Sequence, residues 1–159
     1  MGAGKALLSE ALAKKLGWQF IDANPSLERY IGRNLHEILG RQGEEALHQC
    51  EAEIISHYKG KEQVVVLMEE AVIATEQNRK LLSSEFVVYL KVTTPMQIER
   101  MQVNLSNRPP VLPIADLKAF LDKQHLERDN FYEEVATLTV ESISVEEGVN
   151  TIIKAVEKF

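Results

Sequence analysis

The first residues of the chain combine small side chains with a cation directly ahead of a helical pattern. Gly2, Ala3 and Gly4 precede Lys5. Small residues at a helix start let backbone N–H groups face phosphate oxygens, and a lysine there adds a positive charge. The tetrapeptide therefore predicts a phosphate-binding turn. An ordinary helix start stays open as an alternative, because the full pattern G-x-x-x-x-G-K-[ST] also needs a glycine two positions before Met1 and an apolar strand ahead of it.

Carboxylates follow two apolar runs farther along the chain. Asp22 comes after the run 18–21, and Glu69 and Glu70 come after the run 64–68. An apolar strand that ends in glutamate resembles a Walker B arrangement, in which a carboxylate holds Mg²⁺. For the two glutamates a solvated position after a strand is the plainer interpretation, and a replacement metal site is the alternative.

Composition limits the classes of function. The chain has 159 residues, 45% hydrophobic and 26% charged, which suits one domain spanning residues 1–159. Its formal net charge of -6 argues against binding of nucleic acid or anionic membranes. No apolar run approaches the length of a membrane span. The single cysteine, Cys50, cannot form an internal disulfide, so we expect a cytoplasmic protein.

The hydrophobic spacing predicts alternating helices and strands around these groups. Helical spacing covers 5–16, a segment after Gly43 that ends near Gly60, 75–82, a segment after Pro95, and 145–159. Short apolar runs predict strands at 18–21, 64–67, 86–90 and 138–140, and the run 64–67 lacks polar alternation, as in a strand covered on both faces. This order predicts an α/β fold with a parallel, helix-covered sheet.

One loop stands apart from these elements. Residues 106–113 contain three prolines and a single cation, Arg108. Proline fixes φ and stiffens the segment. A rigid connector and a functional lid are both compatible with this composition.

Several short motifs follow one another in a specific order. They are Met1–Lys5, Lys14–Trp18 with Phe20–Asp22, Gly32–Ile38, Gly43–Leu47 with Glu51, Arg108–Pro109, and Arg128 with Tyr132–Ala136. In this order and spacing the chain resembles the shikimate kinase family over nearly its whole length. The resemblance implies a P-loop kinase fold, a three-layer α/β/α sandwich around a five-stranded parallel sheet. It also implies ATP-dependent phosphorylation of shikimate to shikimate 3-phosphate as the family activity.

The resemblance assigns roles to individual residues. Lys5 and Arg108 would stabilise charge on the transferred phosphoryl group, and Arg108 would belong to a lid at 106–113. Asp22 would help to hold Mg²⁺. The nucleotide, ATP or ADP, would be bound by Gly2, Ala3, Gly4, Lys5, Ala6 and Arg100. The acceptor would be bound by Asn24, His48 and Arg128. An ordinary surface cation is an equally good interpretation of Arg100.

Four positions depart from the family pattern. Ala6 replaces the Ser or Thr whose hydroxyl binds Mg²⁺, so we expect weakened metal binding. Asn24 replaces a carboxylate that contacts the acceptor. The asparagine amide accepts hydrogen bonds but cannot take a proton. His48 replaces an arginine that holds the shikimate carboxylate. Residues 68–70, Met-Glu-Glu, replace a run of three glycines against which the acceptor lies.

These departures favour a shikimate-kinase-like P-loop protein, a pseudoenzyme in which phosphotransfer is impaired or lost, over an active enzyme. Two alternatives stay open. One is an active kinase on shikimate or on an altered small hydroxylated acceptor. The other is a non-catalytic interaction domain that keeps only the fold. We expect a monomer in each case.

The start of the chain raises a structural problem. In the family the strand ahead of the phosphate loop lies at the centre of the sheet. Without it, its two neighbouring strands would each have an unpaired edge. We therefore expect that residues before Met1 are omitted or that the start is misassigned, with an unusual domain as the alternative.

Overall fold

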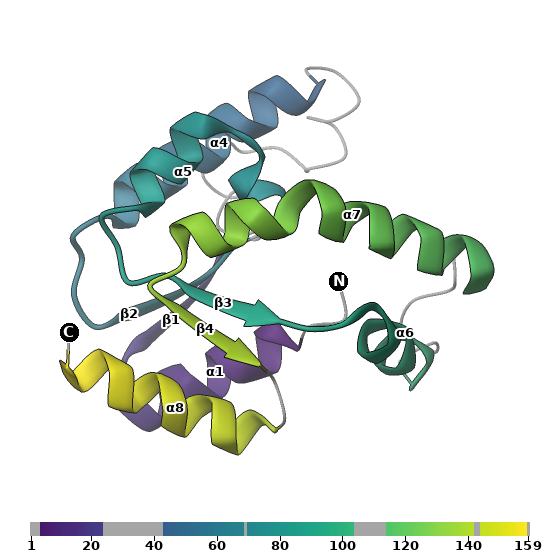
Figure 1. Cartoon of the computed structure of the whole chain (residues 1–159). Helices are drawn as coiled ribbons and strands as arrows, with labels where there is room; N and C mark the ends of the chain where they lie inside the picture. Colours follow the sequence, from purple (N-terminus) through teal and green to yellow (C-terminus); the bar gives the residue numbers. More distant parts are fainter. Residues whose placement is uncertain (1–3, 24–42, 69, 104–113, 142–143, 159) are drawn as a thin grey trace.

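The computed structural model describes residues 4–23, 43–68, 70–103, 114–141 and 144–158, and Figure 1 shows their arrangement. Helices cover both faces of the strands, which confirms the predicted three-layer α/β/α architecture. None of the described helices is long and apolar enough to cross a bilayer. In chain order the elements are α1 (Lys5–Leu16), β1 (Gln19–Asp22), α4 (Gly43–Tyr58), β2 (Val64–Leu67), the 3-10 helix η1 (Glu70–Ala74), α5 (Glu76–Leu82), β3 (Val88–Lys91), α6 (Thr94–Val103), α7 (Ile114–Val135), β4 (Leu138–Glu141) and α8 (Val145–Lys158).

Helix α1 forms over the predicted range because its apolar residues recur on one face. Leu8, Leu12 and Ala13 are buried, and the helix ends at Gly17, whose φ of 69° is left-handed. Glycine adopts this conformation without a Cβ clash and so terminates the helix. The Trp18 N–H donates to the Ala13 carbonyl at 2.9 Å and turns the chain toward β1.

The four described strands form two parallel pairs. Strand β1 pairs with β2 from Gln19↔Val64 to Asp22↔Leu67, and β3 pairs with β4 from Val88↔Leu138 to Lys91↔Glu141. Within the described part of the chain, no backbone ladder joins β2 to β3. The helices η1 and α5 connect these two strands, a crossover that is typical of parallel neighbours.

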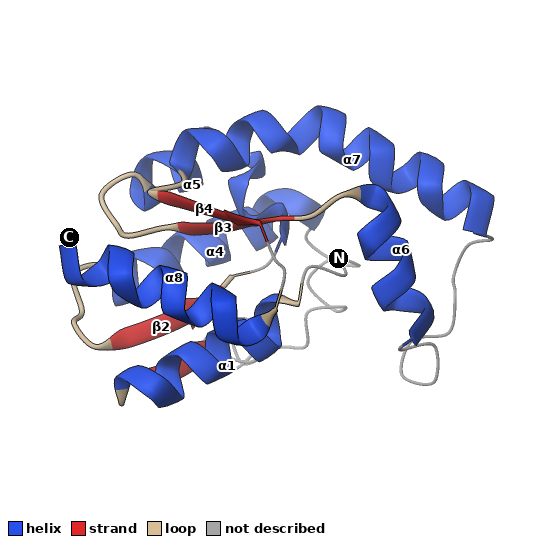
Figure 2. Cartoon of the chain, turned by 60° about the horizontal axis from the view of Figure 1, so that its bottom comes forward, coloured by secondary structure: helices blue, strands red, loops and turns tan. Residues whose placement is uncertain are grey.

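Two apolar clusters fill the space between the layers. The first joins α1 and α8 to strands of both pairs, and its buried members are Leu8, Leu12, Val140, Val149 and Ile152. The second lies among α4, η1, α5 and α7 on the opposite face, and its buried members are Ile55, Val72, Ile73, Leu82 and Val135. Helices therefore lie on both faces of the strands (Figure 2), and apolar side chains fill the space between the layers.

The structure corrects two expectations. Strand β2 is half-buried at all four residues, although its apolar run predicted full coverage. A cavity of about 830 Å³, lined by β2 and β3 and by the helices of both faces, lies beside it. The sequence pattern also predicted no helix at 114–135, whereas the structure has the 22-residue helix α7 there. Its apolar residues do not form one clean stripe, because Leu126 is 83% exposed whereas Leu121 is 1% exposed.

Candidate active site

The predicted phosphate-binding turn lies at the start of α1. Gly4 precedes the first helical residue and has a left-handed φ of 76°. Its carbonyl accepts the Leu8 N–H at 3.2 Å, which closes the first turn of the helix. The N–H groups of that first turn have no intrahelical acceptor, and Gly4 offers no side-chain oxygen to them. This end of α1 therefore suits an anion such as a phosphate.

Two predicted nucleotide residues lie close together at this turn. A Cβ placed on Gly4 would be 3.7 Å from a terminal guanidinium nitrogen of Arg100. Arg100 belongs to α6, so the fold brings a cation from a distant helix to the start of α1. Lys5, the first residue of α1, lines the cavity beside β2. Positive charge from two elements thus surrounds the turn.

The described side chains do not form a complete magnesium site. Ala6, in the first turn of α1, has no oxygen to offer a metal ion. The nearest hydroxyl on the helix, Ser9 Oγ, donates instead to the Lys5 carbonyl. Asp22 lies at the carboxyl end of β1. Over the described ranges no three His, Cys, Asp or Glu side chains gather as metal ligands. The turn fits phosphate, whereas Mg²⁺ would depend on phosphate oxygens and water for its other ligands.

On α4, His48 lies against a buried carboxylate. His48 Nδ1 and Glu51 Oε1 are 3.0 Å apart, and Glu51 is 3% exposed. The spacing of three residues places both side chains on one face of the helix. A neutral imidazole leaves this pair with a net negative charge, and a protonated imidazole makes it neutral. Neither state gives the pair a net positive charge.

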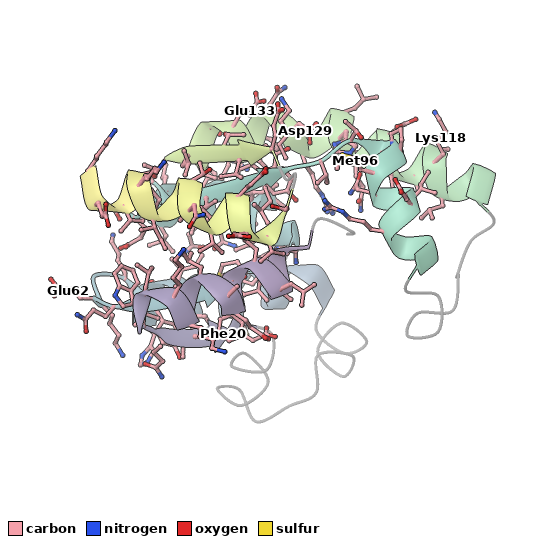
Figure 3. The ribbon with its side chains drawn as sticks, turned by 90° about the horizontal axis from the view of Figure 1, so that it is seen from below. Phe20, Glu62, Met96, Lys118, Asp129 and Glu133 are labelled. Carbon is pink, nitrogen blue, oxygen red and sulfur yellow. The ribbon has the colours of Figure 1, made fainter. Side chains whose placement is uncertain are left out.

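Helix α7 contributes a polar cluster that sequence reasoning missed. His125 Nδ1 is 2.9 Å from Asp129 Oδ2, and His125 Nε2 is 2.7 Å from Gln97 Oε1 on α6. Tyr89 of β3 donates its hydroxyl to Asp129 Oδ1 at 3.4 Å, and burial together with this carboxylate raises the pKa of Tyr89 above its usual range. The His–Asp spacing of four residues was the available signal. Figure 3 shows Asp129 on α7.

The cavity collects residues that the sequence predicted for different roles. Lys5 from α1, Met68 after β2 and Arg128 from α7 all line it. Met68 also packs against the second apolar cluster and against a smaller cluster formed by Ala23 and Ile54, so a side chain fills this position at the end of β2. The remaining predicted residues, Gly2, Ala3, Asn24, Arg108, Glu69 and the lid at 106–113, lie outside the described residues.

Comparison with known proteins assigns the family. The family model described as shikimate kinase matches residues 1–157. The chain belongs to the shikimate kinase family. The shikimate kinase of Legionella pneumophila (strain Corby) is 32% identical over 157 residues, which cover 97% of this chain and 89% of that protein. The enzyme of Francisella tularensis subsp. holarctica (strain OSU18) is 33% identical over 161 residues, covering 100% and 89% respectively.

Solved structures of shikimate kinases share the fold. The structure from Acinetobacter baumannii in complex with shikimate has a TM-score of 0.83 and 27% identity, and it covers 99% of this chain and 89% of that one. The structure from Bacteroides thetaiotaomicron has a TM-score of 0.88 at 22% identity, covers 99% and 94%, and shows the fold alone. Shikimate kinases use ATP and Mg²⁺, and family membership confirms the P-loop kinase fold that the motifs implied.

Proposed function

We propose that this member of the shikimate kinase family is a single-domain cytoplasmic protein that binds nucleotide phosphates and phosphorylates shikimate slowly or not at all. The observation that carries the proposal is the His48–Glu51 pair, with its 3.0 Å separation and its buried carboxylate. By resemblance, His48 occupies the position of an arginine that holds the shikimate carboxylate.

The charge of the pair opposes an anionic acceptor. The carboxylate of the buried Glu51 lies beside the His48 imidazole, so the pair brings an acidic group to a position where, by resemblance, the family has a positive charge. Two like charges 4 Å apart repel by about 4 kcal/mol at an effective dielectric of 20. Arg128, which lines the cavity from α7, offsets part of this repulsion. We therefore expect weak binding of shikimate.

The nucleotide half of the site keeps more of its chemistry. Binding of phosphate groups is favoured by the start of α1, where Gly4 is left-handed and the N–H groups of the first turn have no intrahelical acceptor. Lys5 and the nearby Arg100 add positive charge there. Their contribution needs no metal ion. Ala6 removes one metal ligand, so the proposal includes weakened dependence of nucleotide binding on Mg²⁺.

An alternative function, phosphorylation of a different acceptor, rests on the same observation. The His48–Glu51 pair can exchange hydrogen bonds with hydroxyl groups, which favours a small hydroxylated acceptor that lacks a carboxylate. A kinase for such an acceptor would keep the roles of Lys5, Asp22 and the lid residue Arg108. An interaction domain without nucleotide binding is the remaining outcome.

Thermal unfolding with ADP or ATP, followed by an assay of phosphotransfer to shikimate, tests the proposal. A ligand that binds only the folded chain raises Tm, so both nucleotides should raise it, whereas shikimate should have little effect. Lys5→Met should abolish the shift, and Lys14→Met, in the exposed last turn of α1, should preserve it. Rapid phosphorylation of shikimate would overturn the proposal, and no shift with either nucleotide would indicate an interaction domain.

A further inference from the structure

Helix α6 is held in place differently from the other helices. Among the described side chains, no residue of α6 belongs to the apolar clusters. Its main contact is with α7, beside which it lies at one end of the molecule (Figures 1 and 2). The described residues of α6 that are buried, Thr94 and Gln97, are both polar. The position of α6 therefore depends on polar contacts with α7.

Two hydrogen bonds between described side chains join the helices at these residues. Thr94 Oγ1 donates to Asp122 Oδ1 at 2.7 Å, and Gln97 Oε1 lies 2.7 Å from His125 Nε2. A single contact lets a helix swing about that point, whereas two contacts about one turn apart also fix its direction. Arg100 follows Gln97 by three residues and lies on the same face of α6. The contact nearer to Arg100 is therefore the one between Gln97 and His125.

The ring of His125 is itself fixed by its neighbours. His125 Nδ1 lies 2.9 Å from Asp129 Oδ2, and the Tyr89 hydroxyl donates to Asp129 Oδ1 at 3.4 Å. Tyr89 belongs to β3, so a row of polar contacts runs from a strand through α7 to α6. Each ring nitrogen lies within 3.0 Å of a side-chain oxygen. The ring is thus placed to act through its neighbours rather than by contact with a ligand.

Each of the two helices carries an arginine one turn beyond this contact. On α6 this is Arg100, a terminal nitrogen of which would be 3.7 Å from a Cβ placed on Gly4. On α7 it is Arg128, which lines the cavity together with Lys5. A guanidinium binds phosphate oxygens through a planar fork, so its orientation determines how well it binds.

We infer that His125 and Gln97 are positioning residues for the phosphate-binding turn: their contact fixes the direction of α6 and so holds Arg100 beside Gly4. The inference rests on the proposed function, because it assigns Arg100 to the nucleotide. It extends that function to two residues that do not touch the nucleotide. Loss of their contact lets α6 swing about Thr94 and takes Arg100 away from the turn.

The distance between α1 and α6 tests the inference without any nucleotide. Spin labels are placed at two exposed residues, Glu10 of α1 and Glu99 of α6, in the whole chain with Cys50→Ala. Gln97→Leu removes the amide and keeps a side chain of similar size, so it should broaden the distribution of distances between the labels. A distribution that Gln97→Leu leaves unchanged overturns the inference.

Further variants separate this contact from general loosening of α7. Lys123→Ala removes an exposed ion pair with Glu127 on the same helix and should leave the distances as in the parent chain. His125→Phe keeps a flat ring without nitrogen atoms and should broaden the distances as much as Gln97→Leu. Because both changes remove one contact, the double variant should be no broader than either single variant. Additive broadening contradicts the inference.

A carboxylate at position 97 makes the contact depend on protonation of the ring. Gln97→Glu only accepts hydrogen bonds, so it bonds an imidazolium, whereas a neutral ring that donates to Asp129 turns a lone pair toward it. The other titratable groups around the ring are Asp122 of α7 and Tyr89 of β3. The distances in Gln97→Glu should match the parent at about pH 6 and Gln97→Leu at about pH 9, on either side of the ordinary histidine pKa. Equal widths at both pH values, or a pH dependence that persists when His125→Phe is added, contradict direct contact.

Calorimetry with ADP connects the contact to the nucleotide. Gln97→Leu and His125→Phe should each weaken ADP binding by about fivefold, the effect of one hydrogen bond, whereas Lys123→Ala should not change it. Gln97→Glu should weaken ADP binding relative to the parent only at the higher pH. If the parent chain does not bind ADP, the proposed function fails and the label distances still decide whether the contact positions α6. Broadened distances with unchanged ADP affinity overturn the inference, because the nucleotide then does not need Arg100 in a fixed position.

Discussion

Thr94 Oγ1 donates to Asp122 Oδ1 at 2.7 Å and so connects the first residue of α6 to the middle of α7. Lys118 donates to the second oxygen of the same carboxylate at 2.8 Å. Figure 3 shows Met96 of α6 and Lys118 of α7 at the same end of the molecule. Because α6 also carries Arg100, this carboxylate helps to fix the position of a cation at the phosphate-binding turn.

The first prediction concerns this carboxylate. The hydrogen bond from Lys118, with that from Thr94, lowers the pKa of Asp122. A lowered pKa contributes stability that is complete above the unfolded-state pKa of about 3.9 and is lost as pH falls through the folded-state pKa. Asp122→Asn should therefore lower Tm between pH 5 and 8, and the difference should shrink below about pH 4. A Tm difference that stays constant down to pH 3 would contradict this.

The second prediction uses two left-handed glycines. Gly4→Ala and Gly17→Ala each introduce a Cβ at a positive φ, which costs about 1 kcal/mol of unfolding free energy. Neither Cβ meets an atom closer than 3.7 Å. Denaturant titration should show similar destabilisation in both variants. Calorimetry should show weaker ADP binding only in Gly4→Ala, and equal losses of affinity would place the nucleotide elsewhere.

The third prediction concerns the metal ligand missing at position 6. Ala6→Ser supplies a hydroxyl in the first turn of α1, so Mg²⁺ should enhance ADP and ATP affinity more than in the parent chain. Leu7→Ser is the matched control, because Leu7 is 68% exposed and adjacent in the same turn. Affinities are measured with Mg²⁺ and with a chelator. Strong and equal Mg²⁺ enhancement in all three proteins would mean that another residue already holds the metal.

The fourth prediction concerns the acceptor. His48→Arg places a permanent cation beside the buried Glu51 and restores a fork for a carboxylate. A hydrogen bond to a charged group contributes about 1.5–3 kcal/mol, so shikimate affinity should rise about tenfold or more. His57→Arg, on the exposed end of the same helix, should leave it unchanged. Unchanged affinity in His48→Arg would show that this position does not limit acceptor binding.

Local patterns predicted much of the fold. Helix α1 and strand β2 have the predicted bounds, because Gly17 terminates the helix and a run of four apolar residues marks the strand. Helix α7 was missed because Leu126 is exposed where a helical stripe would bury it. Its partners come from distant elements, and only the tertiary structure determines which of its residues are covered.

The candidate site was predictable in its local parts only. The Gly-Lys pair at the start of α1 indicated the anion-binding turn. The approach of Arg100 to Gly4 and the contact of His125 with Gln97 depend on how α6 packs, which no sequence spacing encodes. The resemblance to shikimate kinases supplied a role for Arg100 and none for His125.

The first apolar cluster has a mechanical consequence. Its buried members include Leu8 and Leu12 of α1, and Val65 of one strand pair and Val88 of the other pack against it. Side chains therefore join the two pairs, between which the described residues form no backbone ladder. Hydrogen bonds are directional, whereas apolar contacts resist separation without fixing orientation. A change in the packing of α1 would therefore reach both strand pairs.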